Sequence, residues 1–357
     1  MEGCKRLHRL SEVGNLVKHE CLIPGLPNDV AMECLLRVPR TYHGVMRGVS
    51  RIWRRVLLSS KFYEERRKLK LVDPWLIVVF TDHSSTGNMC CMYDLNSKRL
   101  LCRAPLPALG WCKEACVEDY KFAAIGQHLL LIGGKTFLAN DVWIYDTVTN
   151  KWKRGGSMQV KRRCFATGVV GETLYVAGGH NESDAVELSM EAYDLQTHTW
   201  RKVANMPLGL DRIQGEVVFK GKLYIKGISR GQQRQLVLVY DPEEDAWQQD
   251  CRLATSEMEA GELVATERAI FTYSARNVFY KFDEASGEWT RVGSGQSCTV
   301  AYYERSQRAF GMGNEIFILT GEMGRPCTQQ LNIGERVVCH TLYLGKSWFR
   351  AGAIVQA

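Results

Sequence analysis

The sequence predicts a chain of two parts, a small α-helical N-terminal module followed by a larger all-β propeller. Up to about residue 71, apolar residues recur at three- and four-residue steps, which is typical of helices. From residue 75 onward, short apolar runs alternate with turn residues, which is typical of strands. Within this β part, an aromatic-Asp pair is followed seven residues later by Trp in four copies: Tyr145-Asp146 to Trp152, Tyr193-Asp194 to Trp200, Tyr240-Asp241 to Trp247, and Phe282-Asp283 to Trp289. The Trp-to-Trp intervals are 48, 47 and 42 residues, a period that indicates a propeller or a repeat array.

The composition is that of an ordinary globular protein, with 45% hydrophobic and 24% charged residues among 357. The first twenty residues lack a signal-peptide core, and the longest apolar runs, such as Trp75 to Phe80, are too short to cross a membrane. The thirteen cysteines are scattered and show no zinc-ligand spacing, which favours reduced thiols. We therefore expect a protein of the cytoplasm or nucleus, or both, without a metal, a cofactor or a membrane partner.

The N-terminal part divides into a flexible tail over residues 1–20 and a helical module over residues 21–72. In the module, one apolar stripe begins after Asn28-Asp29, and Pro39 ends that helix. A second, longer and more basic stripe extends from Tyr42 to Leu57, and a short third segment begins at Phe62. The pattern thus predicts about three helices.

The β part, residues 73–357, divides into six units of four strands, although the degenerate end units leave five or seven possible. The clearest strands are Leu129–Ile132, Leu174–Ala177, Leu223–Ile225 and Ile316–Leu319. In each repeat the Asp should cap its own turn, and the Trp should fill the space between neighbouring blades. The first unit lacks an innermost strand, so we expect Ala353-Ile354-Val355 to supply it and close the ring. The last unit has Thr320-Gly321 and Trp348 but lacks the Tyr-Asp pair.

Residues 51–70 are strongly basic, with eight Lys and Arg against two Glu. Nucleic acid is one partner that such a segment can bind. No aromatic-basic platform or known nucleic-acid module accompanies it, so we favour a solvated helical face or a face that meets an acidic protein.

The repeat resembles the kelch repeat. Its features are Gly133-Gly134 and Gly178-Gly179 at strand ends, then Tyr-Asp, then Trp, then a turn such as Asn205-Met206-Pro207. The resemblance weakens in the fourth unit, where Lys226-Gly227 replaces the glycine pair, and further in the fifth.

The helical module resembles an F-box, on the segments LIPGLPNDVAMECLLRVPR and VMRGVSRIWRRVLLSSKFY. Ser50 departs from the Cys that is more usual in the family. The order of the two modules resembles plant F-box/kelch proteins. This resemblance implies a substrate receptor of an SCF ubiquitin ligase, which binds a Skp-type adaptor, and through it a cullin-RING ligase, and holds a target protein for degradation. At or just behind the adaptor interface we expect Leu26, Pro27, Val30, Leu35, Val38, Pro39, Val49, Trp53 and Leu57, although any of them could instead belong to the core.

The kelch resemblance also places target-binding residues in the loops at one end of the blades. Arginines near the start of the innermost strand line the pocket of kelch proteins that capture peptides, and Arg163 and Arg212 match that place. Arg162, His180 and Arg230 are further candidates. Clustered arginines suit an acidic target segment, and solvated loop charge is the alternative for each residue.

Two other function classes remain open from the sequence. One is a kelch scaffold whose helical module binds something other than an adaptor. The other is a propeller enzyme similar to copper oxidases, although the eight His residues show no paired spacing for copper. We expect a protein that catalyses no reaction itself.

Overall fold

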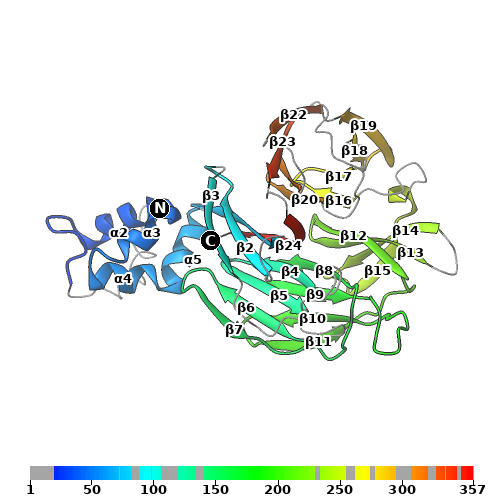
Figure 1. Cartoon of the computed structure of the whole chain (residues 1–357), viewed down its shortest axis with the longest axis horizontal. Coiled ribbons are helices and arrows are strands. Elements are labelled where there is room, and N and C mark those ends of the chain that lie inside the picture. Colours follow the sequence, from blue (N-terminus) through cyan, green and yellow to red (C-terminus); the bar gives the residue numbers. More distant parts are fainter. Residues whose placement is uncertain are drawn as a thin grey trace.

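The computed structural model describes residues 20–71, 73–82, 88–97, 99–105, 120–133, 140–229, 234–254, 262–273, 278–294, 307–320, 327–333, 335–343 and 347–356. A helical module precedes a set of β-sheets, and α5 is the helix that lies against the sheets (Figure 1). The expected order of an α part followed by an all-β part is confirmed.

The helical module contains four α-helices and one 3₁₀ turn in its described part: α2 (Asn28–Arg37), η2 (Arg40–Tyr42), α3 (His43–Met46), α4 (Arg51–Leu57) and α5 (Ser60–Lys68). As expected, α2 ends before Pro39, with Val38 extended because a following proline disfavours the helical conformation. The second predicted stripe is divided into α3 and α4. Ser50 causes the new start, since its Oγ accepts a hydrogen bond from the backbone N–H of Trp53 at 3.1 Å and caps α4.

The module has its own hydrophobic core. The indole N–H of Trp53 donates to the carbonyl of Leu22 at 2.7 Å and ties the N-terminal segment to α4. The buried members of this core are Leu22, Ala31, Met32, Leu35, Leu36, Met46, Val56, Leu57, Phe62, Tyr63 and, from the β part, Val148.

The described strands form six four-stranded sheets. The first contains β24 (Ser347–Gln356), β1 (Pro74–Asp82), β2 (Asn88–Asp94) and β3 (Arg99–Pro105). The second contains β4 (Tyr120–Ile125), β5 (His128–Gly133), β6 (Val142–Asp146) and β7 (Lys151–Arg154). The third contains β8 (Ala166–Val170), β9 (Thr173–Ala177), β10 (Met190–Asp194) and β11 (Thr199–Val203).

The fourth sheet contains β12 (Arg212–Phe219), β13 (Lys222–Ser229), β14 (Arg234–Asp241) and β15 (Ala246–Gln249), followed by a 3₁₀ turn, η4 (Cys251–Leu253). The fifth contains β16 (Glu262–Ala265), β17 (Ile270–Tyr273), β18 (Val278–Asp283) and β19 (Glu288–Ser294). The sixth contains β20 (Gln307–Met312), β21 (Glu315–Thr320), β22 (Cys327–Ile333) and β23 (Glu335–Tyr343). The four strands that the sequence showed most clearly fall in β5, β9, β13 and β21.

The C-terminal strand completes the first sheet. β24 pairs antiparallel with β1, with Ile354 opposite Leu76 and Ala353 opposite Ile77, so the expected closure by the C-terminal run is confirmed. The strands β24, β4, β8, β12, β16 and β20 each contact the next in this order, and β20 contacts β24. The contacts between these innermost strands therefore run round all six sheets.

The sixth sheet departs from the repeat, and the prediction that Trp348 belongs to it is wrong. Trp348 lies in β24, opposite Thr81 of β1. The strand order of the sixth sheet is β20-β21-β23-β22, with β21 and β23 parallel. Closing the first sheet removes Trp348 from the last repeat, and β22 takes the outer position instead.

The Tyr-Asp pair holds the turn that follows it in each repeat. Asp194 accepts backbone N–H bonds from Gln196 and Thr197 at 2.7 and 3.1 Å, which confirms the predicted turn cap. The Tyr hydroxyl forms a hydrogen bond with the side chain of the residue five positions later, whose backbone is in the left-handed conformation. The pairs are Tyr145 with Asn150, Tyr193 with His198, and Tyr240 with Asp245. Phe282 lacks a hydroxyl, and the corresponding left-handed residue is Gly287.

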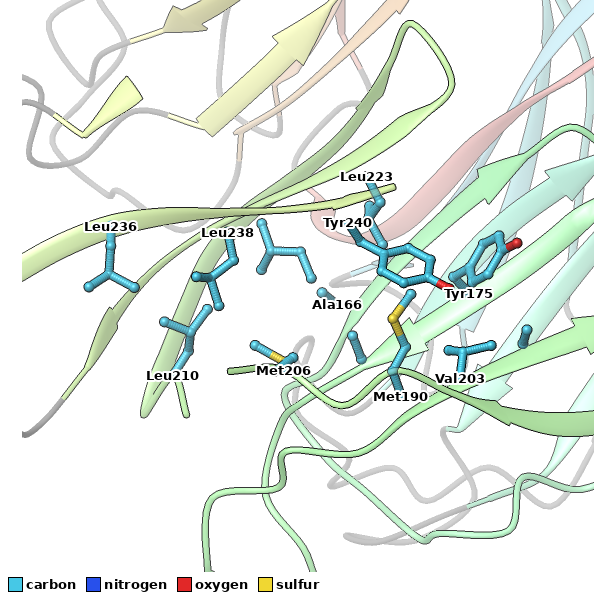
Figure 2. Packing of buried hydrophobic residues seen from close by; sticks show 13 residues of the cluster. Ala166, Tyr175, Met190, Val203, Met206, Leu210, Leu223, Leu236, Leu238 and Tyr240 are labelled. Atoms are coloured by element: carbon cyan, nitrogen blue, oxygen red, sulfur yellow. The ribbon is translucent and has the colours of Figure 1, made fainter. Parts of the chain in front are cut away.

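The repeated Trp packs between sheets, as expected. The ring of Trp200 lies 4.9 Å from that of Tyr193, and its indole N–H donates to the carbonyl of Gly156 in the segment after the second sheet at 2.8 Å. Figure 2 shows a neighbouring layer, in which Tyr175 of the third sheet faces Tyr240 of the fourth across their interface. Met206 and Leu210, from the segment that joins these sheets, fill the same layer.

Candidate functional surfaces

Five of the nine residues expected at the adaptor interface are exposed: Leu26, Pro27, Val30, Pro39 and Val49. Val49 is more open than Leu26 or Val30, with 62% of its surface accessible. Leu26, Pro27 and Val30 surround the start of α2, where Leu26 closes a turn through its N–H bond to the carbonyl of Ile23 at 3.1 Å. These apolar side chains add nothing to the core and are available to a partner.

The other four residues face inward to different degrees. Leu35 and Leu57 are buried members of the core, whereas Val38 and Trp53 are half-buried and pack against it. Their positions follow from helix geometry, because residues three or four apart along a helix share one face, and this face of α2 and of α4 packs into the core of the module. Leu35 and Leu57 therefore support the surface from behind.

Three further exposed apolar residues lie in the same module and were not singled out from the sequence: Tyr42 at 60%, Val45 at 77% and Leu58 at 37% accessible surface. Tyr42 and Val45 belong to the second apolar stripe, which the sequence showed as one continuous helical face. Val45 and Met46 are neighbours on α3 and point in different directions from the helix, so Met46 is buried while Val45 is exposed.

Some of the basic side chains of residues 51–70 form ion pairs with nearby acidic residues. Arg66 is buried and forms an ion pair with Asp73 at 2.5 Å, and Lys68 forms one with Glu65 at 2.6 Å. Arg55 forms an exposed pair with Glu20 at 3.0 Å. Arg51, Arg54 and Lys61 are exposed. The segment is thus a basic helical surface with one arginine directed inward.

At the loop end of the sheets, the expectation for Arg162 does not hold. Its guanidinium is fully buried and forms an ion pair at 2.8 Å with Glu191, which is also fully buried. Nη1 donates to the carbonyls of Gly178 and Ser189, and Nη2 donates also to the hydroxyl of Ser189, whereas Nε has no hydrogen-bond partner among the described residues. Burial lowers the pKa of Arg162, and the Glu191 carboxylate opposes that effect. Because no part of this side chain reaches solvent, Arg162 cannot contact a target.

The structure brings Arg163 and His180 together. Their backbones form a two-bond bridge, with N–H to carbonyl distances of 3.0 and 2.9 Å. The side chain of Arg163 is about one-quarter exposed, and its guanidinium forms an ion pair with Asp184. His180 is half-buried, and its Nδ1 has no hydrogen-bond partner among the described residues. Both residues lie where the β9–β10 loop meets the segment that enters β8.

Arg212 begins β12 and is exposed. It pairs through its backbone with Ile228 of β13. Arg230 lies outside the described residues. The loop end thus presents Arg163 and Arg212 at the starts of the third and fourth sheets, while Arg162 belongs to the interior.

In the part of the chain that the structure describes, no group of three or more His, Cys, Asp and Glu side chains is placed to hold a metal ion. None of the described helices has the length and apolar character needed to cross a membrane.

Two family models match this chain. The model described as "FKB95, Kelch-repeats domain" matches residues 77–345, and the F-box domain model matches residues 23–65. The F-box match ends within α5 and the kelch match begins within β1, so the two matches meet where the helical part joins the β part.

Several curated Arabidopsis thaliana proteins are similar over much of their length. F-box/kelch-repeat protein At2g44130 is 32% identical over 268 residues, covering 64% of each chain. F-box/kelch-repeat protein At1g67480 is 34% identical over 209 residues, covering 58% of this chain and 54% of that protein. F-box/kelch-repeat protein At1g16250 is 27% identical over 334 residues, covering 85% and 84%. The first two matches thus span less than two thirds of those relatives. The kelch model alone accounts for most of the chain, and with the F-box model preceding it, this protein belongs to the F-box/kelch-repeat family.

Proposed function

We propose that this protein is the substrate-recognition subunit of an SCF-type ubiquitin ligase. The F-box would bind a Skp-type adaptor, and through it a cullin-RING ligase, while the kelch domain would hold a target protein. The observation that carries the proposal is the set of exposed apolar side chains on the F-box module, above all Val45 and Val49, on a chain that also contains a kelch domain.

The proposed adaptor surface has a physical basis. Leu26, Val30, Val45 and Val49 expose apolar surface although the module has a complete core beneath them. Burying this surface against an apolar groove would release about 25 cal/mol for each Å² removed from water. Helices α2, α3 and α4 project away from the sheets (Figure 1), so an adaptor bound there leaves the kelch domain free.

The receptor would contribute proximity rather than bond chemistry. Holding a target beside the ubiquitin-loaded enzyme raises the effective concentration of its lysines. Arg163 and Arg212 are the side chains that we propose for target contact, and their charge suits an acidic segment. The ligase would act in the cytoplasm, the nucleus or both.

Binding to a purified plant Skp-type adaptor tests the proposal. We expect a stable complex with the full chain, and at least tenfold weaker binding for a Leu26→Ala/Pro27→Ala variant. Leu188→Ala is the matched control, because Leu188 is an exposed leucine on the kelch domain. The proposal fails if the wild type does not bind, or if the double substitution leaves the affinity unchanged.

A further inference from the structure

The F-box module packs against two turns of the second sheet, which contains β4 to β7. Val148, in the β6–β7 turn, is 1% exposed and is a member of the F-box core. In the β4–β5 turn, a Cβ built on Gly126 would lie 2.8 Å from Nη1 of Arg67, so the α5 side chain contacts that turn closely. The two domains therefore meet through packed side chains as well as through the peptide that links them.

Arg40 is the polar centre of this contact. It follows α2, is 3% exposed, and its Nη2 donates to Oγ1 of Thr147 in the β6–β7 turn at 2.6 Å. The Thr147 hydroxyl donates in turn to the carbonyl of Gln127 in the β4–β5 turn at 2.6 Å. One chain of hydrogen bonds thus joins the F-box to both turns of the sheet.

The guanidinium of Arg40 also lies over the ring of Trp75 in β1, with its carbon 4.1 Å from the ring centroid. Burial lowers the pKa of Arg40 to about 10, so it remains charged at neutral pH and keeps this cation–π contact. Arg40 therefore touches the first sheet and the second at once.

Asp73 holds the backbone of Arg40 in place. Its Oδ2 accepts the backbone N–H of Arg40 at 2.9 Å and Nη2 of Arg66 at 2.5 Å. Arg66 also donates from Nη1 to the carbonyl of Val38 at 2.7 Å. Asp73 belongs to the linker, residues 69–73, so linker, α5 and the end of α2 are fixed to one another beside Arg40.

We infer that Arg40 is a positioning residue, which fixes the angle between the F-box and the kelch domain. By its length alone, a linker of five residues would limit the separation of the two domains but not their relative rotation. The Arg40–Thr147 bond and the Trp75 contact oppose such rotation, because any swing breaks a buried charged hydrogen bond. This inference rests on the proposed function, in which the angle decides which lysines of a bound protein face the ubiquitin-loaded enzyme.

Single-molecule energy transfer on the full chain tests whether the angle is fixed. Dyes are attached through genetically encoded amino acids at Lys61 and Glu243, which are both exposed, one in each domain. The variants are Arg40→Met, which keeps an unbranched side chain over Trp75, and the milder Thr147→Val, which removes the hydroxyl that accepts from Arg40 and donates to Gln127. Arg37→Met is the matched control, since Arg37 ends α2 three residues before Arg40, and its half-exposed side chain pairs with Glu33 of the same helix at 2.8 Å.

We expect the distribution of transfer efficiency to broaden at least twofold in Arg40→Met and Thr147→Val, and to match wild type in Arg37→Met. Adaptor affinity should stay within twofold of wild type in all three. We call Arg40→Met and Thr147→Val the joint variants, because both alter the contact between the domains. If both are folded by circular dichroism and the width of their transfer-efficiency distribution is unchanged, the inference is overturned.

A second arm tests the consequence for ubiquitin transfer. The probe is the chain's own kelch-domain lysines, modified in a ligase reconstituted with a Skp-type adaptor, cullin and RING subunit. In the joint variants the rate should fall at least threefold, and peptide mass spectrometry should find modification spread over more lysines. An unaltered rate and lysine pattern despite a broadened distribution overturns the positioning role. If wild type itself fails to bind the adaptor, the proposed function fails, and energy transfer still decides whether Arg40 fixes the angle.

Discussion

Arg162 Nη2 lies 2.8 Å from Oε1 of Glu191, and neither side chain has any solvent-accessible surface. Glu191 also accepts the backbone N–H groups of Gln159 and Val160 at 2.7 and 3.1 Å. The pair therefore holds the segment that enters the third sheet against β10. Arg163, the residue after Arg162, makes an ion pair with Asp184, which is largely exposed. Two adjacent arginines thus have different roles.

We expect Arg162→Met to lower the free energy of unfolding by about 3–5 kcal/mol, because it leaves Glu191 charged and buried without its partner. Arg163→Met should change it by less than about 1 kcal/mol, since ion pairs open to water contribute little. Urea unfolding of both variants measures the difference. Equal losses would show that the buried pair has no special structural role.

The glycine pair at the end of β9 should be intolerant of a side chain at its second position. Gly179 has a left-handed φ of +85°, and a Cβ there would lie 2.3 Å from the carbonyl oxygen of Arg163. Gly171 is also left-handed, at +62°, but has open space around it. Gly171→Ala should cost about 1 kcal/mol from backbone strain alone, and Gly179→Ala clearly more. Thermal and urea unfolding compare the two, and a Gly179→Ala variant as stable as Gly171→Ala would contradict the steric argument.

His43 should make the F-box sensitive to acid. Its Nε2 lies 3.0 Å from the carbonyl of Val38, so Nε2 donates and Nδ1 accepts from the Tyr63 hydroxyl at 3.1 Å. Burial, with the nearby charges of Arg66, Arg40 and Arg47, lowers the pKa of His43 from 6.5 to about 4. The folded state thus resists a proton that the unfolded state takes up.

The stabilising effect of neutral His43 is complete above pH 6.5 and is lost as the pH falls toward about 4. The expected loss across this window is about 3 kcal/mol. Other groups also titrate here, so the measurement is the difference between wild type and His43→Gln in urea unfolding at several pH values. A difference that does not vary with pH would mean that His43 is not held neutral in the fold.

Charge on the exposed F-box surface should weaken adaptor binding without unfolding the module. Val45 is 77% exposed, so Val45→Asp should leave the melting temperature within about 2 °C, since surface substitutions rarely exceed about 0.5 kcal/mol. Adaptor affinity should fall at least tenfold, because a carboxylate is costly to bury in an apolar interface. Leu188→Asp on the kelch domain is the control. Equal adaptor binding by both variants would exclude Val45 from the interface.

Much of the fold could be predicted because the signals are local. The Asp of each repeat caps its own turn within three residues, and Pro39 ends α2 whatever surrounds it. The structure also shows one local interaction that could have been predicted from the sequence but was not. The Tyr of the pair and the residue five positions later, such as Tyr193 and His198, form a hydrogen-bonded unit that stabilises a left-handed turn.

The errors concern partners that are distant in the sequence. Trp348 was expected in the last repeat, but pairing of β24 with β1, some 270 residues earlier in the chain, decides its sheet. Arg162 and Arg163 differ only in which of them faces Glu191, and that depends on the position of β10. Likewise, Val45 and Met46 share one apolar stripe, and the packing of α3 decides which is buried.

The sequence by itself determined the two-part plan, the repeat unit and its turns, and the family resemblance, because these depend on residue types at short spacing. The tertiary structure alone decided which apolar residues of the F-box stay exposed, which arginine at the loop end is buried, and how Arg40 joins the two domains. Those outcomes depend on which surfaces meet, and burial of a charge such as Arg40 is stable only where Thr147 and Trp75 are brought to it.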